Sequence, residues 1–369
     1  MKHLKNTWYV AAWDYEVGRH LMMREILDRP ILLYREENGR AVALSDICPH
    51  RYAPLHKGRL CGDRVECPYH GLQFDANGQC VHNPHPHGNG PIPRNARVRS
   101  YPVIEQYGAI WVWMGEKEPD PNALPDYHFI SDTDNYRTIR GVFDIENHYE
   151  MVNDNALDLT HVTFTHAGTL GAGLDNVRNE RVVRERIGNT LWCKRFNDGI
   201  EAGSDFQRFN PALVGIKVDK QQNVRWDPPG YIVIIIRYVQ ADTEDTHYTS
   251  IFAGNLLTPI SETRTRMFWS VSRTFGLQIE ALDHAMRASA ELALMVQDKT
   301  MIEDQLRLMG TTDLESMRPV YIADDATPVA ARRLLKELIE AEEREEREQR
   351  AAGSATRRAE PEATPERVT

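Results

Sequence analysis

Residues 48–72 read "CPHRYAPLHKGRLCGDRVECPYHGL" and contain two short pairs of metal-binding residues. Cys48 and His50 form a Cys-x-His pair, and Cys67 and His70 form a Cys-x-x-His pair after the intervening residues 51–66. Thiolate and imidazole ligands suit both zinc and iron–sulfur clusters. Common zinc motifs pair Cys with Cys and His with His, whereas this chain pairs Cys with His twice. The mixed order favours a [2Fe–2S] centre with two Cys on one iron and two His on the other.

Two Asn-Gly dipeptides flank this stretch and predict β-hairpins. Asn38-Gly39 divides the apolar runs of "ILLYREENGRAVAL", and Asn77-Gly78 does the same in "GLQFDANGQCVHN". Asn-Gly between such runs is typical of tight hairpin turns. One hairpin leads into the first ligand pair and the other leaves from the second. We therefore expect both pairs at loop tips of a small antiparallel β domain, to which "YGAIWVWMG" adds a further strand.

Composition excludes several classes of function. The chain has 369 residues, 27% of them charged, and a formal net charge of -10 without a long Lys/Arg cluster. Nucleic-acid binding needs a cationic surface, so no nucleic-acid partner is expected. No run of eighteen apolar residues occurs, and the start "MKHLKNTWYV" lacks a signal-peptide core. We expect a cytoplasmic protein that does not bind a membrane, in which the five cysteines are poor disulfide candidates.

The pattern Cys-x-His-x16-Cys-x-x-His resembles the Rieske motif. This resemblance implies that Cys48 and Cys67 bind one iron of the [2Fe–2S] cluster, while His50 and His70 bind the outer iron. Imidazoles in place of thiolates raise the reduction potential of the cluster. Arg51 either donates a hydrogen bond toward the cluster or is a solvated loop residue, and the sequence leaves both readings open.

Other cysteines and histidines near the motif have simpler interpretations. Cys61 and Cys80 lack partners at ligand spacing and are interpreted as small buried thiols. The segment "VHNPHPHGNG" carries His82, His85 and His87 but no neighbouring Cys or carboxylate. We interpret it as a loop beside the cluster, stiffened by its Pro and Gly residues.

The rest of the chain predicts a second domain after a Pro-rich connector, "EKEPDPNALPDYHF". Strands are expected in "YIVIIIRYV" and "TRMFWSVSRTF", one long helix over 279–309, and a second helix over 327–350. The last residues have a composition typical of disorder. We divide the chain into a Rieske domain at 1–130, a catalytic domain at 131–345 and a disordered tail at 346–369.

A second set of metal-binding residues lies in "MVNDNALDLTHVTFTH". Asp158 and His161 are three residues apart, so a helix would present them on one face. His166 would join them if the helix loosened near Val162-Thr163. Two His and one distant carboxylate make the facial triad of non-haem Fe(II) oxygenases, which leaves positions open for O₂ and substrate. Asn155 lies near the open side of that iron or caps the helix turn.

This spacing after a Rieske motif resembles the catalytic domain of Rieske non-haem iron oxygenases. The resemblance implies that His161 and His166 are ligands and that Asp158 is a bridging carboxylate, although Asp158 could also only cap its turn. The family's third ligand is an Asp on a long downstream helix, and "LALMVQDKTMIEDQ" supplies Asp298. An unpaired carboxylate in that apolar stretch would be costly. Glu303 and Asp304 are the competing candidates.

The closest resemblance is to the vanillate and dicamba O-demethylase branch, carried by "NTWYVAA", "DICPHRYAPL", "CPYHGLQFD" and "CVHNPH". It implies an α+β chain: an antiparallel β Rieske domain, then a helix-on-antiparallel-sheet (Bet v1/START-like) domain. It also implies O- or N-dealkylation of a small aromatic compound with O₂ and NADH-derived electrons, releasing an aldehyde. The chain has neither a dinucleotide-binding fingerprint nor a ferredoxin Cys run. A separate flavin reductase, a ferredoxin, or both must therefore deliver the electrons.

The family assembles as homotrimers, which implies that the cluster of one subunit faces the iron of the next. Asp158 would then accept hydrogen bonds from His161 of its own chain and from the neighbour's His70. The alternatives are a ring or methyl hydroxylase or a dihydroxylating dioxygenase with the same metals, an electron carrier without catalysis, and a zinc-binding module. The apolar strand "GYIVIIIRYV" before Arg237 favours a weakly polar substrate, although its isoleucines are equally well explained as sheet core.

Overall fold

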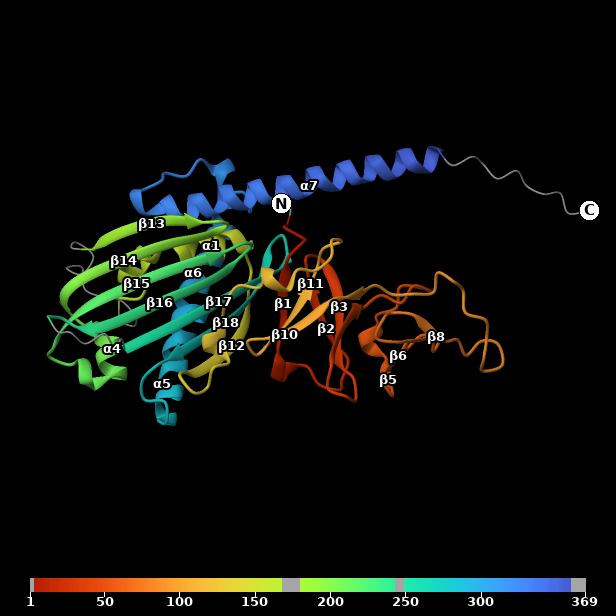
Figure 1. Ribbon diagram of the computed structural model, residues 1–369, viewed down its shortest axis with the longest axis horizontal. Helices are drawn as coiled ribbons and strands as arrows, with labels where there is room; N and C mark the ends of the chain where they lie inside the picture. The colour runs from red at the N-terminus through yellow and green to blue at the C-terminus, as the bar shows by residue number, and fades with distance from the viewer. Residues whose placement is uncertain (1–2, 168–179, 243–248, 360–369) are drawn as a thin grey trace, which may run out of the picture.

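The computed structural model describes residues 3–167, 180–242 and 249–359, and Figure 1 shows two β-rich units side by side. The N-terminal unit consists of small sheets, whereas the C-terminal unit is one large antiparallel sheet with helices packed against it. The α+β fold expected from the sequence is confirmed.

Three antiparallel sheets build the N-terminal unit, in the strand orders β1-β11-β10, β2-β3-β4-β9 and β5-β6-β7-β8. Their strands are β1 (Trp8–Trp13), β2 (Met22–Ile26), β3 (Arg29–Arg35), β4 (Ala41–Ser45), β5 (Arg59–Cys61), β6 (Arg64–Glu66), β7 (Gln73–Phe74), β8 (Cys80–His82), β9 (Ser100–Tyr101), β10 (Val103–Gln106) and β11 (Ala109–Trp113).

Both expected hairpins are present, since β3 pairs with β4 and β7 pairs with β8. The second turn requires glycine, because Gly78 has a φ of 75° and a Cβ there would collide with the carbonyl oxygen of Val98. The Cys48–His50 pair follows β4, and the Cys67–His70 pair joins β6 to β7. As expected, the hairpins place both pairs on loops of this small β unit.

A seven-stranded antiparallel sheet forms the C-terminal unit, in the order β12-β18-β17-β16-β15-β14-β13. Its strands are β12 (Arg137–Ile145), β13 (Arg181–Ile187), β14 (Thr190–Glu201), β15 (Lys217–Asp227), β16 (Tyr231–Gln240), β17 (Thr249–Ser261) and β18 (Arg264–Arg273). Its helices are α1 (Tyr149–Leu157), α2 (Val162–Thr165), α4 (Ser204–Phe209), α5 (Glu280–Glu291), α6 (Lys299–Met309) and α7 (Ala326–Ala359).

The unbroken apolar run of strand β16 is explained by its position, because both faces of the sheet are covered there. Ile232 and Tyr238 belong to the core beneath the helices. Tyr231 and Val233 belong to a second core shared with the N-terminal unit. Alternate residues of a strand point to opposite faces, so each face of β16 buries apolar side chains.

The N-terminal unit is attached to the large sheet through that second core. Trp8 and Trp13 of β1 pack there with Phe268 of β18. Hydrogen bonds tie β1 to two further strands of the sheet: Trp13 Nε1 donates to the Gly141 carbonyl of β12 at 2.9 Å, and Thr258 Oγ1 of β17 donates to the Val10 carbonyl at 2.7 Å. The two units therefore share buried apolar surface rather than a flexible connection.

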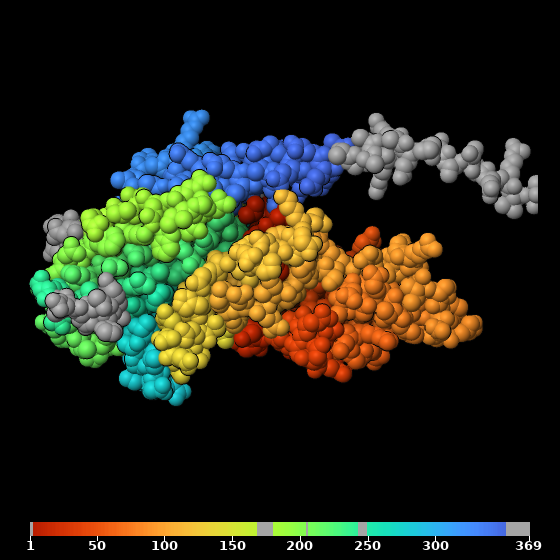
Figure 2. Space-filling view, viewed as in Figure 1, coloured from red at the N-terminus to blue at the C-terminus, as the bar shows by residue number. Residues whose placement is uncertain are grey.

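Helix α7 runs along one side of the molecule and spans both units, as Figure 2 shows. Its Glu342 carboxylate accepts hydrogen bonds from the backbone amides of Lys5 and Asn6 at 2.8 and 2.7 Å. Of the tail that we expected to be disordered, residues 346–359 lie in this helix, and residues 360–369 fall outside the described residues. Among the described helices, none is both long and apolar enough to cross a membrane.

Candidate metal centres and substrate cavity

Two turns of the same design hold the four residues of the first ligand set. The Cys48 amide donates to the Ala53 carbonyl at 2.9 Å, and the Cys67 amide donates to the Leu72 carbonyl at 2.8 Å. Each turn also closes with a bond back to its cysteine carbonyl, from the residue four positions later. Both cysteines are buried, at 1% and 2% exposure. The shared backbone pattern brings each Cys and its His to one end of the N-terminal unit.

The two histidines of this set lie against each other. The ring centroids of His50 and His70 are 4.5 Å apart, and the rings are inclined at 64° to each other. Nδ1 of His70 is buried, yet it has no hydrogen-bond partner among the described residues. A buried unpaired ring nitrogen is costly, and a metal ion at that position would satisfy it. This geometry fits the Rieske cluster.

The sulfur of Cys48 also fits a metal ligand. Burial raises the pKa of the Cys48 thiol to about 11, while the backbone amides of His50 and Arg51 donate hydrogen bonds to the sulfur and oppose the rise. A thiolate here therefore needs a nearby positive charge, which iron supplies. Of the two readings of Arg51, the structure supports a hydrogen bond to the cluster site, but from the backbone, because its side chain is exposed.

Of the two cysteines expected to be buried thiols, Cys80 is buried and Cys61 is only half-buried. All five cysteines are free, and the thiols of Cys61 and Cys80 contact Glu66 and the His82 carbonyl at 3.5 Å. The loop that carries His85 and His87 leaves both histidines exposed.

The second ligand set begins where helix α1 ends. We expected the helix to continue through Asp158 and loosen near Val162-Thr163, and this was wrong. Helix α1 ends at Leu157, and Asp158 starts a 3-10 turn over Leu159–His161. The Asp158 carboxylate caps that turn, accepting hydrogen bonds from the Thr160 amide at 2.9 Å and hydroxyl at 2.7 Å. A side chain that bonds to its own backbone two residues on favours turns over helix.

We also expected a hydrogen bond between the Asp158 carboxylate and His161, and this was wrong. His161 Nδ1 lies 2.5 Å from the backbone carbonyl oxygen of Asp158, whereas Oδ1 of the carboxylate accepts from Thr160. The carbonyl accepts the ring N–H and so turns Nε2 of His161 toward the centre of the site.

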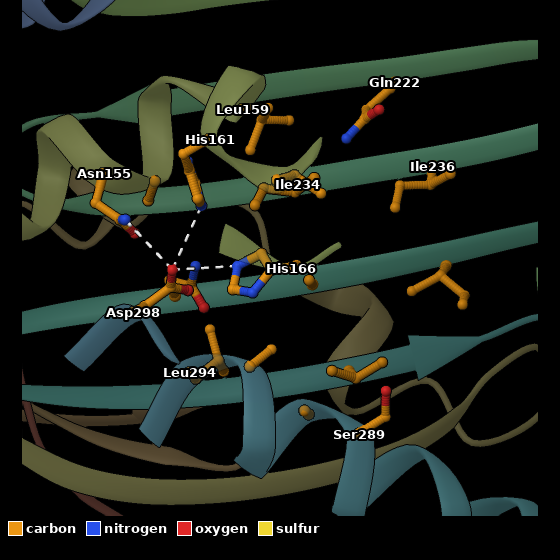
Figure 3. A pocket seen from close by; sticks show the side chains of 18 of the residues that line it. Asn155, Leu159, His161, His166, Gln222, Ile234, Ile236, Ser289, Leu294 and Asp298 are labelled. Atoms are coloured by element: carbon orange, nitrogen blue, oxygen red, sulfur yellow. Dashed lines mark hydrogen bonds and ion pairs between the residues drawn. The ribbon is translucent and has the colours of Figure 1, made fainter. Parts of the chain in front are cut away.

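Asp298 meets both histidines in the interior, and Figure 3 shows the three side chains converging. One oxygen of Asp298, Oδ1, lies 3.4 Å from His161 Nε2 and 3.1 Å from His166 Nε2. The three candidate ligand atoms lie within 4.8 Å of one another. Asp298 is 7% exposed and His166 is 2% exposed. Two imidazoles and one carboxylate at this spacing fit a mononuclear non-haem iron.

Electrostatics favour a charged carboxylate at the centre of this triad. Burial by itself would raise the pKa of Asp298, but hydrogen bonds from His161 and His166 outweigh it and lower the pKa to about 2. Burial likewise disfavours a charged His166, but Asp298 raises the pKa of that ring overall. The site therefore presents one negative oxygen between two imidazole nitrogens.

A π-helical segment, η7 (Leu292–Asp298), connects α5 to α6 and carries Asp298 at its end. The sequence predicted one uninterrupted helix here, which is confirmed except for this change in winding. Single π turns inside α-helices are frequent at functional sites. Gln297, which the sequence reading missed, places its Oε1 2.8 Å from Nδ1 of His166.

Of the other candidate residues at the iron site, only one lies at the triad. Asn155 Nδ2 donates to Asp298 Oδ1 at 3.4 Å, so it lies at the triad rather than at a helix cap. Glu303 instead accepts from the Glu146 amide at 2.9 Å. Asp304 pairs with Arg307. Both competitors of Asp298 are thus engaged elsewhere.

A cavity of about 240 Å³ opens from the triad, between the large sheet and the helices. Strand β16 lines it with Ile234, Ile236 and Tyr238, and Figure 3 shows the two isoleucines projecting into it. Arg237 does not line it and lies instead against the ring of Phe252, at 5.6 Å. Polar cavity residues that the sequence reading missed come from the neighbouring strands: Arg195, Asn197, Lys220 and Gln222.

Comparisons with known proteins agree with this architecture. The Rieske [2Fe-2S] domain matches residues 7–102, and the vanillate O-demethylase oxygenase C-terminal domain matches residues 145–341. The second match covers more than half of the chain. The chain belongs to the Rieske non-haem iron oxygenases.

Similar proteins align with this chain over most of its length. The dicamba O-demethylase oxygenase component of Stenotrophomonas maltophilia is 34% identical, over 93% of this chain and 99% of the relative. The chloroacetanilide N-alkylformylase oxygenase component of Rhizorhabdus wittichii is 31% identical, over 92% and 96%. The crystal structure of dicamba monooxygenase with non-haem iron and dicamba superposes with a TM-score of 0.79, at 31% identity over 94% and 100%.

The family match also settles the type of enzyme and its cofactors. This protein is a Rieske-type oxidoreductase, the oxygenase component of a multicomponent monooxygenase system. Its cofactors are a [2Fe–2S] cluster and a mononuclear iron, and its electrons come from a separate reductase.

Proposed function

We propose that this oxygenase removes an alkyl group, in the first instance methyl, from oxygen or nitrogen of a small aromatic compound. Hydroxylation of the alkyl carbon gives a hemiacetal or hemiaminal, which collapses to an aldehyde and the free phenol or amine. One oxygen atom of O₂ ends in the aldehyde and the other in water, and NADH supplies two electrons through the reductase. Relatives named for O-demethylation and for N-dealkylation support this reaction class.

The observation that carries the proposal is the buried triad at the wall of a largely apolar cavity between the sheet and the helices. An engineered cavity of about 150 Å³ holds benzene, so about 240 Å³ suits one substituted ring. Isoleucines of β16 provide the apolar surface for such a ring.

We assign roles to the residues of both sites. Cys48, Cys67, His50 and His70 hold the cluster, and His161, His166 and Asp298 hold the mononuclear iron. When bound, the cluster relays single electrons, and the mononuclear iron activates O₂. Asn155 donates to Asp298 and keeps that carboxylate oriented. The Asp158 carbonyl and Gln297 fix the outer nitrogens of the two histidine rings.

We further propose a homotrimer in which the cluster of one subunit faces the catalytic site of the next, with Asp158 at the junction. In Figure 1, β5–β8 lie at the end of the molecule away from α1 and α6, with the other N-terminal sheets between them. Exposed aromatic side chains flank both sites, namely Tyr52 and Tyr69 at the cluster turns and Phe164 between the catalytic histidines. Exposed apolar groups of this kind are typical of interaction surfaces.

The proposal also keeps the Rieske domain at residues 1–130 and the catalytic domain at 131–345, and places the enzyme in the cytoplasm with its NADH-dependent partner. The test is a screen of aromatic methyl ethers and N-methyl anilines with the iron-loaded enzyme and a surrogate reductase. We expect O₂ uptake to match released formaldehyde. A hydroxylated ring or methyl group without aldehyde would support the hydroxylase alternative instead.

A further inference from the structure

Arg332 of α7 binds two carboxylates on helix α1. Glu150 and Asp154 lie one turn apart on that helix and are therefore neighbours on its surface. The Arg332 guanidinium donates to Asp154 from Nε at 2.8 Å and from Nη2 at 2.6 Å, and its Nη1 donates to Glu150 at 3.0 Å. The three side chains are between 11% and 19% exposed. A planar guanidinium held in this way fixes direction as well as distance.

The backbone around Asp154 leads directly to the iron site. The next residue, Asn155, donates to Asp298 Oδ1 at 3.4 Å, and Figure 3 shows this contact. The Asp154 carbonyl accepts the amide of Asp158 at 3.1 Å, and the Asp158 carbonyl in turn accepts the ring N–H of His161. Two of the three candidate iron ligands are therefore oriented by residues that follow Asp154 closely in the chain.

Packing alone does not hold this side of α1. A second cavity of about 240 Å³ is lined by residues of α1, α6 and α7, among them Asp154, His161 and Arg332. On its sheet side the helix is tied down by the buried Asn153, whose Nδ2 donates to the Pro229 carbonyl between β15 and β16 at 3.0 Å. The side toward α7 borders the cavity, so its position depends on the contacts of Arg332.

Without Arg332, two carboxylates would face each other in a poorly solvated place. Burial raises the pKa of both Glu150 and Asp154, and the charge of Arg332 opposes the rise at each. Asp325 and Glu315 add further negative charge near Asp154 and do not replace the guanidinium. Removing one partner of a buried pair leaves an uncompensated charge. The two carboxylates would then separate or take up a proton, and α1 would move with them.

We propose that Arg332 is a positioning residue for the mononuclear iron. Its guanidinium sets the rotation of α1, and thereby the directions in which Asn155 and the Asp158 carbonyl meet the iron ligands. This inference rests on the proposed assignment of the triad as the iron site, and it does not depend on which compound is dealkylated. Loss of the hydrogen-bond partners of metal ligands typically lowers metal affinity by about 10–100-fold. Because Arg332 acts one contact further away, we expect the lower end of that range.

The test measures Fe(II) binding to the full-length enzyme that keeps its cluster but is depleted of mononuclear iron. Anaerobic titration gives the dissociation constant, and the electron paramagnetic resonance spectrum of the nitric oxide adduct reports the geometry around the bound iron. We expect Arg332→Met to raise the dissociation constant about tenfold and to broaden that spectrum. Arg332→Lys keeps the charge but not the fork of donors, and should lie between Arg332→Met and the wild type.

The matched control is Arg24→Met. Arg24 and Glu16 form a comparable ion pair within the N-terminal unit, at 2.7 Å and with side chains 18% and 16% exposed. If Arg332 only stabilised the fold, both Met variants would lower the melting temperature and neither would change the dissociation constant of Fe(II). A positioning role instead changes that constant and the nitric oxide spectrum in the Arg332 variants alone.

Wild-type iron affinity and spectrum in folded Arg332→Met would overturn the inference. If that variant does not fold, Arg332→Lys decides in the same way, because wild-type values there would overturn it too. A wild-type enzyme that binds no Fe(II) after depletion would refute the iron site, and the inference with it. Failure of dealkylation looks different: the iron measurements would come out as expected, yet no compound would release an aldehyde.

Discussion

Replacing Asp298 by Asn tests the assignment of the third iron ligand. Asparagine preserves the shape of the side chain but removes the negative charge that faces His161 and His166 at 3.4 and 3.1 Å. The matched control is Asp304→Asn, because Asp304 lies on the same helical run and pairs with Arg307 on the surface. We expect Asp298→Asn to lose the mononuclear iron and all product formation, and the control to keep both.

The size of the effect follows from the charge. A lowering of the Asp298 pKa from 3.8 to about 2 corresponds to about 2 kcal/mol of folding free energy in the metal-free site. Because the folded-state pKa is lowered, this stabilisation is present above the ordinary carboxyl pKa and is lost as the pH falls toward 2. At pH 7, Asp298→Asn should therefore destabilise the mononuclear-iron-depleted protein by about 2 kcal/mol.

The assay combines iron content, visible spectrum and urea unfolding of the depleted protein at pH 7. Iron should fall from about three to about two per chain, since the cluster keeps its two irons, while the visible spectrum stays unchanged. Full iron content with normal activity in Asp298→Asn would refute the assignment. If Asp298→Asn unfolds at the same urea concentration as the wild-type protein, the electrostatic reasoning is contradicted. The ligand assignment would then rest on the iron content alone.

Three further predictions concern the cluster and its junction. Cys67→Ala should bleach the visible spectrum, and an unchanged spectrum would contradict the cluster ligands. Asp158→Asn should keep both metal sites but lose nearly all coupled turnover. Mixed trimers of this variant with Cys67→Ala chains should recover partial activity. An active monomer would rule out transfer between subunits. Gly71→Ala should lower cluster occupancy, because Gly71 has a φ of 70° that costs other residues about 1–2 kcal/mol. Gly62→Ala, at a φ of 61° with no atom near a Cβ, provides the control for backbone strain alone.

Local chemistry made the metal sites predictable from the sequence. Cys48 and His50 lie in one short turn, so their spacing along the chain nearly determines their spacing in space. Asp298 was identified at long range for a different reason: the family resemblance implies a third ligand on a long downstream helix, and the cost of an unpaired carboxylate in that apolar stretch supported the choice. The position of the helix break was missed because two local preferences compete: the helical spacing of Asp158 and His161, and the capping of Thr160 by Asp158.

The polar end of the cavity was not predictable in this way. Lys220 lies in "KVDKQQNVRWD", which has no motif and an unremarkable alternation. Its position matters only because β14, β15 and β16 pair in a register that places Asn197, Lys220 and Tyr238 side by side. Register is set by the hydrophobic pattern and the turns of the paired strands together, so the sequence of β15 alone does not contain it. Reading β16 alone therefore suggested a weakly polar substrate, whereas the adjacent strand contributes the charge.

The π-helical turn shows how neighbouring residues can act on one imidazole. Gln297 Oε1 only accepts hydrogen bonds, so the proton of His166 lies on Nδ1, 2.8 Å away. Nε2 faces the Asp298 carboxylate at 3.1 Å and donates to it in the metal-free site. A metal ion would take the place of that proton, while Gln297 keeps the proton on Nδ1 and so holds the ring in the ligating tautomer. Consecutive residues, Gln297 and Asp298, therefore approach opposite edges of the ring, and the wider π winding sets their directions.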